Sequence, residues 1–152
     1  MPGERWKLML SQEKMKVLVV EDNEDDIAII RRAMRKSEMK CDLSFARDGA
    51  EAIDFLWQKG EYEDAPRPDL ILLDLNLPKI DGLDVLAKIK EDDKLRRIPV
   101  IVLTISQHEQ DMIRAYDSGA ASYMNKPVDS KDFERLIQTV QDYWKIARIP
   151  TK

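Results

Sequence analysis

The sequence predicts an α/β protein in which a doubly wound, five-stranded parallel sheet in the strand order 2-1-3-4-5 carries helices on both faces. Three observations support this prediction. Five short apolar runs alternate with five segments of helical periodicity. Residues 70–73 and 100–103 are apolar at every position, as in strands that are covered on both sides. Strand–helix units in series, joined by right-handed crossovers, produce a parallel sheet.

Each element follows from its own pattern of residues. The expected strands are residues 17–20, 41–46, 70–73, 100–103 and 122–124, and the expected helices are residues 25–36, 50–59, 81–90, 107–118 and 130–148. The second strand alternates between polar and apolar positions, which predicts an edge strand. The fourth helix has Met112, Ile113 and Tyr116 at helical spacing and should end at Gly119. The last helix has the clearest apolar stripe, from Phe133 to Ala147.

The length and composition limit the class of protein. The 152 residues fit one ordinary domain, which we expect at residues 16–148, with an N-terminal extension at 1–15 and a C-terminal tail at 149–152. A net charge of −4 with a pI near 5.2 argues against nucleic acid as the main partner, because phosphate binding needs a basic face. No apolar run approaches the roughly 20 residues of a membrane span, so no membrane association is expected.

Two further features indicate a cytoplasmic protein. The first ten residues contain charges but no long apolar stretch or cleavage site, which does not resemble a signal peptide. The single cysteine, Cys41, excludes an internal disulfide and fits a reducing compartment.

The residues that follow the strands carry the chemistry, because open sheets of this kind bind ligands beyond the carboxyl ends of their strands. Glu21 and Asp22 follow the first strand, Asp74 follows the third, Thr104 follows the fourth and Lys126 follows the fifth. Strands one and three are neighbours, so their acidic residues should meet in one pocket. Such a cluster needs a counter-charge, and Mg²⁺, or Mn²⁺, suits a pocket of carboxylates that leaves room for water or phosphate oxygens.

This arrangement predicts a phosphoryl acceptor. Asp74 is the best nucleophile, because the metal would lie on one side of it and Lys126 on the other. The ammonium of Lys126 and the metal would offset the roughly two negative charges of a phosphoryl group, and the Thr104 hydroxyl could donate a hydrogen bond to it. The alternative for Glu21 and Asp22 is that they simply cap the first helix.

Four motifs resemble the receiver domain of two-component response regulators, which has a flavodoxin-like fold. They are VVEDNEDD at 19–26, PDLILLDLNLPKIDG at 68–82, VIVLT at 100–104 and YMNKPV at 123–128. The resemblance implies that Asp74 is the phosphoacceptor, that Asp22 and the Asn76 backbone carbonyl bind Mg²⁺ with Asp74, and that Glu21 holds a metal-bound water. It further implies that Thr104 and Tyr123 form a switch pair, and that Lys126 precedes a cis peptide bond at Pro127.

The resemblance extends to partners and activity. The segments GEYEDAPRPD and DYWKIARIP are similar to those of small bacterial regulators that work with phytochrome-type sensor histidine kinases. The protein would then not be an enzyme, apart from catalysing its own phosphotransfer and dephosphorylation. Ile105 is bulkier than the residue usual at that position in the family, so it could crowd the phosphoryl site or restrict Tyr123. Because only four residues follow 148, we expect the output to be a binding event, with a downstream protein target.

Three other classes of protein share part of this pattern. A flavodoxin-like cofactor binder shares the fold, but Glu21 and Asp22 would repel a phosphate unless a metal intervened. A haloacid-type phosphatase needs a second acid two residues after its nucleophile, where this chain has Asn76. A phosphorylation-independent interaction module remains the alternative to a phosphorylated regulator.

The final helix also predicts a homodimer. Its stripe is longer than one sheet face needs, and Tyr143, Trp144 and Ile146 lie near its end. Exposed apolar surface marks partner sites, and two-fold dimers are the commonest closed assembly. The opposing expectation is that the stripe packs wholly on its own sheet.

Overall fold

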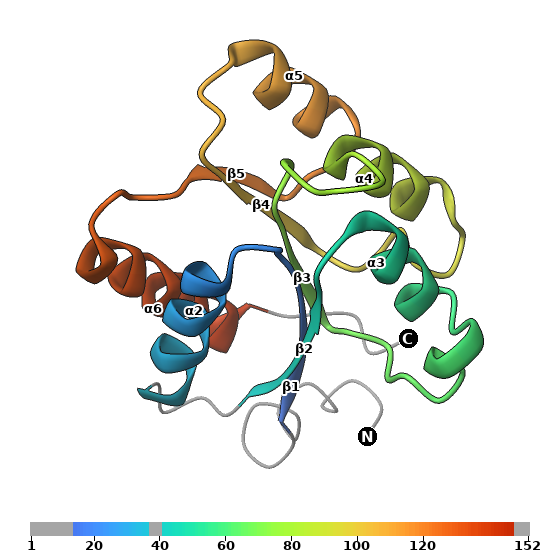
Figure 1. Ribbon diagram of the computed structural model, residues 1–152, viewed down its shortest axis with the longest axis horizontal. Helices are drawn as coiled ribbons and strands as arrows, with labels where there is room; N and C mark the ends of the chain where they lie inside the picture. Colours follow the sequence, from blue (N-terminus) through green and yellow to red (C-terminus); the bar gives the residue numbers. More distant parts are fainter. Residues whose placement is uncertain (1–13, 37–40, 148–152) are drawn as a thin grey trace.

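The computed structural model describes residues 14–36 and 41–147, which form a central sheet between two layers of helices (Figure 1). The five parallel strands have the order β2-β1-β3-β4-β5, as predicted. They are β1 (Met15–Val20), β2 (Cys41–Ala46), β3 (Leu70–Leu73), β4 (Val100–Thr104) and β5 (Ser122–Asn125). The helices are α2 (Glu24–Lys36), α3 (Gly49–Leu56), α4 (Gly82–Glu91), α5 (Glu109–Asp117) and α6 (Ser130–Ile146), with a short 3-10 helix η2 (Gly60–Tyr62). The expected segment before residue 14 and the tail at 149–152 lie outside the described residues.

The strands separate two cores by their alternating side chains. Leu18, Val20, Ile71 and Leu73 point to the side of α3, α4 and α5, while Val17 and its alternate neighbours point to the side of α2 and α6. All residues of β3 and β4 are buried, which confirms that these strands are covered on both faces. The strand β2, which the alternating pattern placed at an edge, is the first strand of the described sheet, beside β1, and is partly exposed.

The last helix, α6, lies beside α2 on one face of the sheet (Figure 1). Its apolar stripe is used mainly on its own sheet: Phe133, Ile137, Val140 and Trp144 are all buried in the core beneath it. An ion pair between Glu134 and Lys36, with an Nζ–Oε1 distance of 2.7 Å, also joins α6 to α2. Most of the stripe is therefore not available to a second copy of the chain.

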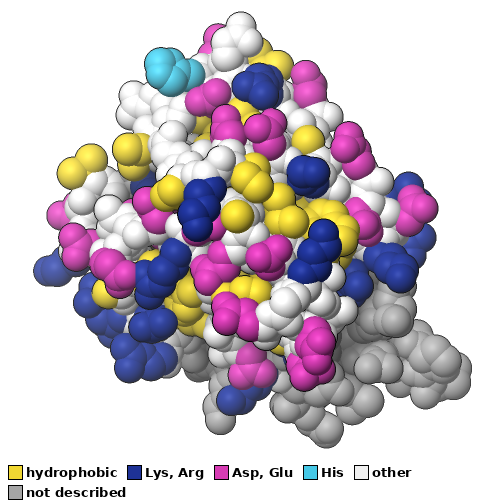
Figure 2. Space-filling model, turned by 45° about the vertical axis from the view of Figure 1, so that its right-hand side comes forward, with side chains coloured by type: hydrophobic (Ala, Val, Ile, Leu, Met, Phe, Trp, Pro, Cys, Tyr) yellow, Lys and Arg dark blue, Asp and Glu magenta, His cyan; other side chains and the backbone are white. Residues whose placement is uncertain are grey.

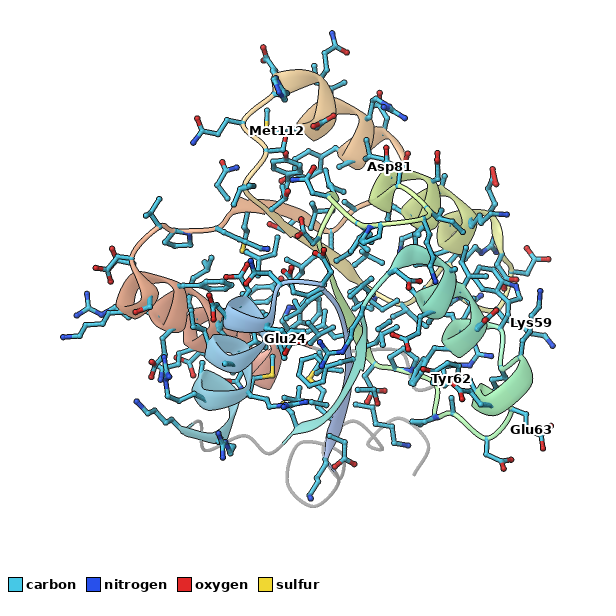
Figure 3. All side chains as sticks on the ribbon, viewed as in Figure 1. Glu24, Lys59, Tyr62, Glu63, Asp81 and Met112 are labelled. Atoms are coloured by element: carbon cyan, nitrogen blue, oxygen red, sulfur yellow. The ribbon has the colours of Figure 1, made fainter. Side chains whose placement is uncertain are left out.

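Helix α5 packs differently from what its sequence indicated. The apolar residues Met112, Ile113 and Tyr116 are 37%, 46% and 48% exposed, and Ala115 is the buried residue of the helix. Met112 projects from α5 at the top of the view in Figure 3. Helical spacing identifies a stripe but not what covers it. Here Ala115 belongs to the core that includes residues of α4, and the Tyr116 hydroxyl accepts a hydrogen bond from the N–H of Tyr123 in β5 at 3.1 Å. The helix ends as predicted, because Gly119 adopts a φ of +101° that few other residues tolerate.

Charges are distributed over the surface. Figure 2 shows acidic and basic side chains interspersed among apolar ones on the described part of the face in view. None of the helices within residues 14–36 and 41–147 is long and apolar enough to cross a bilayer.

Candidate metal and phosphoryl site

The carboxyl ends of β1, β3, β4 and β5 place the predicted residues at one edge of the sheet. The N–H of Asp74 donates to the Val20 carbonyl at 3.0 Å, which fixes the end of β3 beside the end of β1. The N–H of Lys126 donates to the Thr104 carbonyl at 2.9 Å, which fixes the end of β5 beside that of β4. Thus residues separated by up to 105 positions meet in one pocket.

The acidic trio predicted from the first and third strands is present. Glu21, Asp22 and Asp74 each offer a carboxylate oxygen, and these oxygens all lie within 4.8 Å of one another. Glu21 and Asp74 are only 2% and 5% exposed, while Asp22 is exposed. Hard oxygen donors at this spacing, with one side open to solvent, fit a divalent cation that keeps some of its water.

Helix capping does not explain these acids. Asn23 performs that role at α2, because its Oδ1 accepts a hydrogen bond from the N–H of Asp26 at 3.0 Å and its carbonyl accepts from Ile27. Glu21 instead accepts from the N–H of Asn23 at 3.1 Å and turns its other oxygen toward Lys126. The capping alternative for Glu21 and Asp22 is therefore not supported by the structure.

Lys126 is the cation within the cluster, and its side chain is only 4% exposed. Its Nζ donates to Glu21 at 2.5 Å, to Asp26 at 2.9 Å and to Asp74 at 3.0 Å. Burial alone would lower the pKa of Lys126, but the hydrogen bonds to Glu21 and Asp26 outweigh burial and raise that pKa above its ordinary value. The ammonium therefore stays charged.

For Glu21 the effect of burial on the pKa outweighs that of the hydrogen bonds. Burial raises the pKa of its carboxyl to about 7, and the nearby Asp74 charge adds to this effect. The hydrogen bonds from Lys126 and from the Asn23 N–H only partly oppose the rise. A second cation near Glu21 would favour its ionised form.

The loop after Asp74 is held tightly. The N–H of Asn76 donates to Asp74 Oδ1 at 3.2 Å, and the N–H of Gly82 donates to the Leu75 carbonyl at 3.1 Å. A Cβ atom at Gly82 would lie 2.5 Å from the Asp74 carbonyl oxygen and 2.6 Å from the Leu75 Cα. Only glycine allows the first turn of α4 to pack this closely behind the acidic residue.

The predicted switch residues are linked through the loop after β4. Thr104 is fully buried, and its Oγ1 accepts from the N–H of Ser106 at 3.2 Å. The Tyr123 hydroxyl donates to the Ser106 carbonyl at 3.0 Å, and Asn125 Nδ2 donates to the same oxygen at 2.7 Å. Ile105, which the sequence indicated as a source of crowding, is 67% exposed and does not fill the space between them.

One predicted feature is wrong. The Lys126–Pro127 peptide bond is trans, and the part of the chain that the structure describes contains no cis peptide bond. For a bond before proline the trans form is favoured by about 0.5–1 kcal/mol, so a cis bond needs specific surroundings to impose it. The YMNKPV motif alone does not show that such surroundings exist.

Sequence reasoning also missed residues that the structure brings into the site. Asp26 contacts Lys126 directly, and its place in the acidic VVEDNEDD motif directly after the first strand was a signal that it could lie near the strand ends. The buried Ser106 and its neighbour across the sheet, Asn125, connect Thr104 to Tyr123 through a backbone carbonyl. No pattern in the sequence indicates which backbone carbonyl will accept hydrogen bonds from two side chains, as that of Ser106 does.

Comparison with known proteins shows the family to which this fold and site belong. Residues 17–140 match the response regulator receiver domain family. The chain is 44% identical over 128 residues to response regulator Rcp1 from Synechocystis sp., which covers 84% of this chain and 87% of that protein. It is also 40% identical over 129 residues, 84% of this chain and 82% of the relative, to the probable methanogenesis regulatory protein FilR2 from Methanothrix harundinacea.

Solved structures give the same result. The phosphorylated cyanobacterial phytochrome response regulator RcpA has a TM-score of 0.88 and 42% identity, with coverage of 91% of this chain and 99% of that chain. The Mn²⁺-bound form of Rcp1 has a TM-score of 0.87 and 42% identity, with coverage of 90% and 99%. The chain therefore belongs to the response regulator receiver domain family and resembles its phytochrome-associated members. It is a response regulator of two-component signalling, which implies a histidine kinase as its partner, and it is not a classical enzyme.

Proposed function

We propose that Asp74 is the phosphoacceptor of this response regulator, in a reaction that depends on Mg²⁺ or Mn²⁺. The observation that supports this proposal most strongly is the buried Asp74 carboxylate, which forms the acidic trio with Glu21 and Asp22 and accepts a hydrogen bond from the Lys126 ammonium at 3.0 Å. The residues fit a divalent cation, which Asp22, Asp74 and the Asn76 carbonyl would hold directly and Glu21 through water. When bound, the cation would offset part of the negative charge of the incoming phosphoryl group.

The proposed transfer conserves atoms and charge. One Asp74 carboxylate oxygen attacks the phosphorus of a phosphohistidine on the kinase, forming an O–P bond as the N–P bond breaks. The bonding electron pair stays on the imidazole nitrogen, which takes up a proton from solvent. Lys126 stabilises the transferred group: an ion pair at about 4 Å contributes about 4 kcal/mol at an effective dielectric of 20, before desolvation.

Thr104 and Tyr123 are proposed to report the phosphorylation. If the Thr104 hydroxyl moves toward the phosphoryl group to donate a hydrogen bond to it, Ser106, whose N–H donates to Thr104 Oγ1, would be drawn along with it. Because the Ser106 carbonyl also accepts from Tyr123, a shift of this loop would alter the surface of α5 and β5. Crystals with and without beryllofluoride, a phosphoryl mimic, would test this; unchanged positions of both residues would contradict it.

We propose a phytochrome-type sensor kinase as the phosphoryl donor. This is supported by the likeness to response regulator Rcp1 and to RcpA, which is a cyanobacterial phytochrome response regulator. The receiver unit is proposed to run from residue 16 to 148, which includes the family match at 17–140.

We also propose a homodimer through α6, although less of its apolar surface is exposed than the sequence indicated. Tyr143 and Ile146 are 60% and 76% exposed, and they are the part of the stripe that the sheet does not cover. Light scattering should give a dimer mass that Tyr143→Ser with Ile146→Ser reduces to a monomer mass. A monomer in both phosphorylation states of the wild type would end this proposal.

The phosphoacceptor proposal is tested by labelling. Wild-type protein incubated with acetyl phosphate and Mg²⁺ should gain one phosphoryl group, as measured by intact-mass spectrometry. Asp74→Asn, or wild type in excess chelator, should gain none. Full labelling of the variant would show that Asp74 is not the phosphoacceptor. Full labelling in chelator would show that the reaction does not need a divalent cation.

A further inference from the structure

Asp26 lies outside the trio of carboxylates that fits a metal ion, yet it contacts the buried lysine of the site. Its Oδ2 lies 2.9 Å from Lys126 Nζ, and its side chain is 22% exposed. The hydrogen bond from its N–H to Asn23 Oδ1 fixes the first turn of α2 beside the strand ends. Figure 3 labels Glu24, the first residue of α2.

Lys126 divides its three ammonium protons among three carboxylates. They belong to Glu21, Asp26 and Asp74. Glu21 and Asp74 are members of the acidic trio that fits a metal ion, so a cation held there competes with Lys126 for the same two carboxylates. Asp26 is not a member of the trio, and its contact with Lys126 can therefore persist when the other two are lost.

Building on the proposed role of Asp74 as phosphoacceptor, we propose that Asp26 is a positioning residue that sets the affinities of the site for a divalent cation and for a phosphoryl group in opposite directions. The Asp26 carboxylate draws Lys126 away from Glu21 and Asp74, which leaves their oxygens available to a cation. It also adds a negative charge that attracts the cation.

The same carboxylate acts against a phosphoryl group. It engages the ammonium that would otherwise pair fully with the phosphoryl oxygens, and it repels their negative charge. Removing the charge of Asp26 should therefore weaken cation binding and strengthen phosphoryl binding. A residue that only stabilised the local structure would weaken both when replaced.

The test uses the full chain and two probes. Mn²⁺ affinity is measured by calorimetry, and beryllofluoride affinity is measured by ¹⁹F NMR in saturating Mg²⁺. In Asp26→Asn the Mn²⁺ affinity should fall about three- to tenfold and the beryllofluoride affinity should rise by about the same factor, as expected for one screened charge at the edge of a buried site. Asp26→Glu, which keeps the charge, should restore both affinities toward the wild-type values.

The matched control is Asp25→Asn. Asp25 is exposed on the same turn of α2, and its replacement changes the net charge equally without removing a contact to Lys126. Equal affinities in the Asp25 and Asp26 variants, or a fall of both affinities in Asp26→Asn, would overturn the inference. Wild-type protein that binds neither probe would instead overturn the proposed function on which the inference depends.

Discussion

Replacing Lys126 with methionine should destabilise the metal-free protein severely and make its stability depend on a divalent cation. Methionine keeps much of the length of the side chain but removes the charge. At the observed Nζ–Oδ2 distance of 3.0 Å, attraction to Asp74 alone is about 5.5 kcal/mol at an effective dielectric of 20. Glu21 and Asp26 add to it, while repulsion among the carboxylates and desolvation of the ammonium oppose it.

The net cost should fall in the range known for breaking a buried ion pair, about 3–5 kcal/mol. Saturating Mg²⁺ should recover much of this loss, because a cation replaces the missing positive charge. A ligand at about 100 times its Kd adds about 2.7 kcal/mol to the free energy of unfolding, and the variant should bind Mg²⁺ more tightly than the wild type because no lysine competes.

Urea unfolding, followed by tryptophan fluorescence in chelator and in saturating Mg²⁺, measures both effects. Lys131→Met, at an exposed position of α6, is the control for loss of a lysine charge. A loss below about 1 kcal/mol in chelator, as expected for a solvent-exposed pair, would refute this reasoning. So would equal stabilisation of Lys126→Met and wild type by Mg²⁺.

Three further substitutions test the surroundings of the site and the core. Gly82→Ala should cost about 1–3 kcal/mol in urea unfolding and slow the labelling of Asp74, because the new Cβ would displace the backbone behind it. Asp48→Ala should cost about 1 kcal/mol at neutral pH, because Asp48 accepts from the Glu51 N–H at the start of α3. That hydrogen bond lowers the pKa of Asp48 below its usual 3.8, so its stabilisation is present above that pH and is lost as the pH falls through the lowered pKa. Trp144→Ala should cost about 3–5 kcal/mol, because this ring is buried in the core under α6.

Each of these three predictions has a result that would contradict it. Wild-type stability of Gly82→Ala would show that the loop after Asp74 shifts freely. A difference between Asp48→Ala and wild type that is the same at neutral and strongly acidic pH would mean that the cap is not a carboxylate. Trp144→Ala should be compared with Tyr143→Ala, whose ring is 60% exposed, and equal costs would contradict the packing of α6.

The strand-end residues could be predicted because they depend on two simple rules. Buried strands have apolar runs, and the residues after parallel strands meet at one edge of the sheet. Those rules placed Glu21, Asp22 and Asp74 close enough to share a cation, and the structure has them within 4.8 Å of one another. The face of the sheet to which each strand side chain points follows from the alternation along the strands.

Other features depended on rotations and contacts that periodicity does not determine. Asp26 meets Lys126 because α2 starts at Glu24 with a particular orientation, which no pattern of apolar residues specified. The apolar residues of α5 were expected to mark its packing face, but Met112, Ile113 and Tyr116 are exposed and the buried residue of the helix is Ala115. Similarly, the stripe of α6 predicted exposed surface at Trp144, whereas the sheet covers that ring and leaves Tyr143 outside.

The position of the phosphoryl group is the most direct test of the account. Protein phosphorylated with acetyl phosphate in Mg²⁺ would be reduced with borohydride, which converts an aspartyl phosphate to homoserine, and its peptides would then be sequenced by mass spectrometry. We expect homoserine in place of Asp74 and at no other position. Homoserine in place of Asp22 or Asp26, or an unmodified peptide around Asp74 in protein that carries a phosphoryl group, would contradict it.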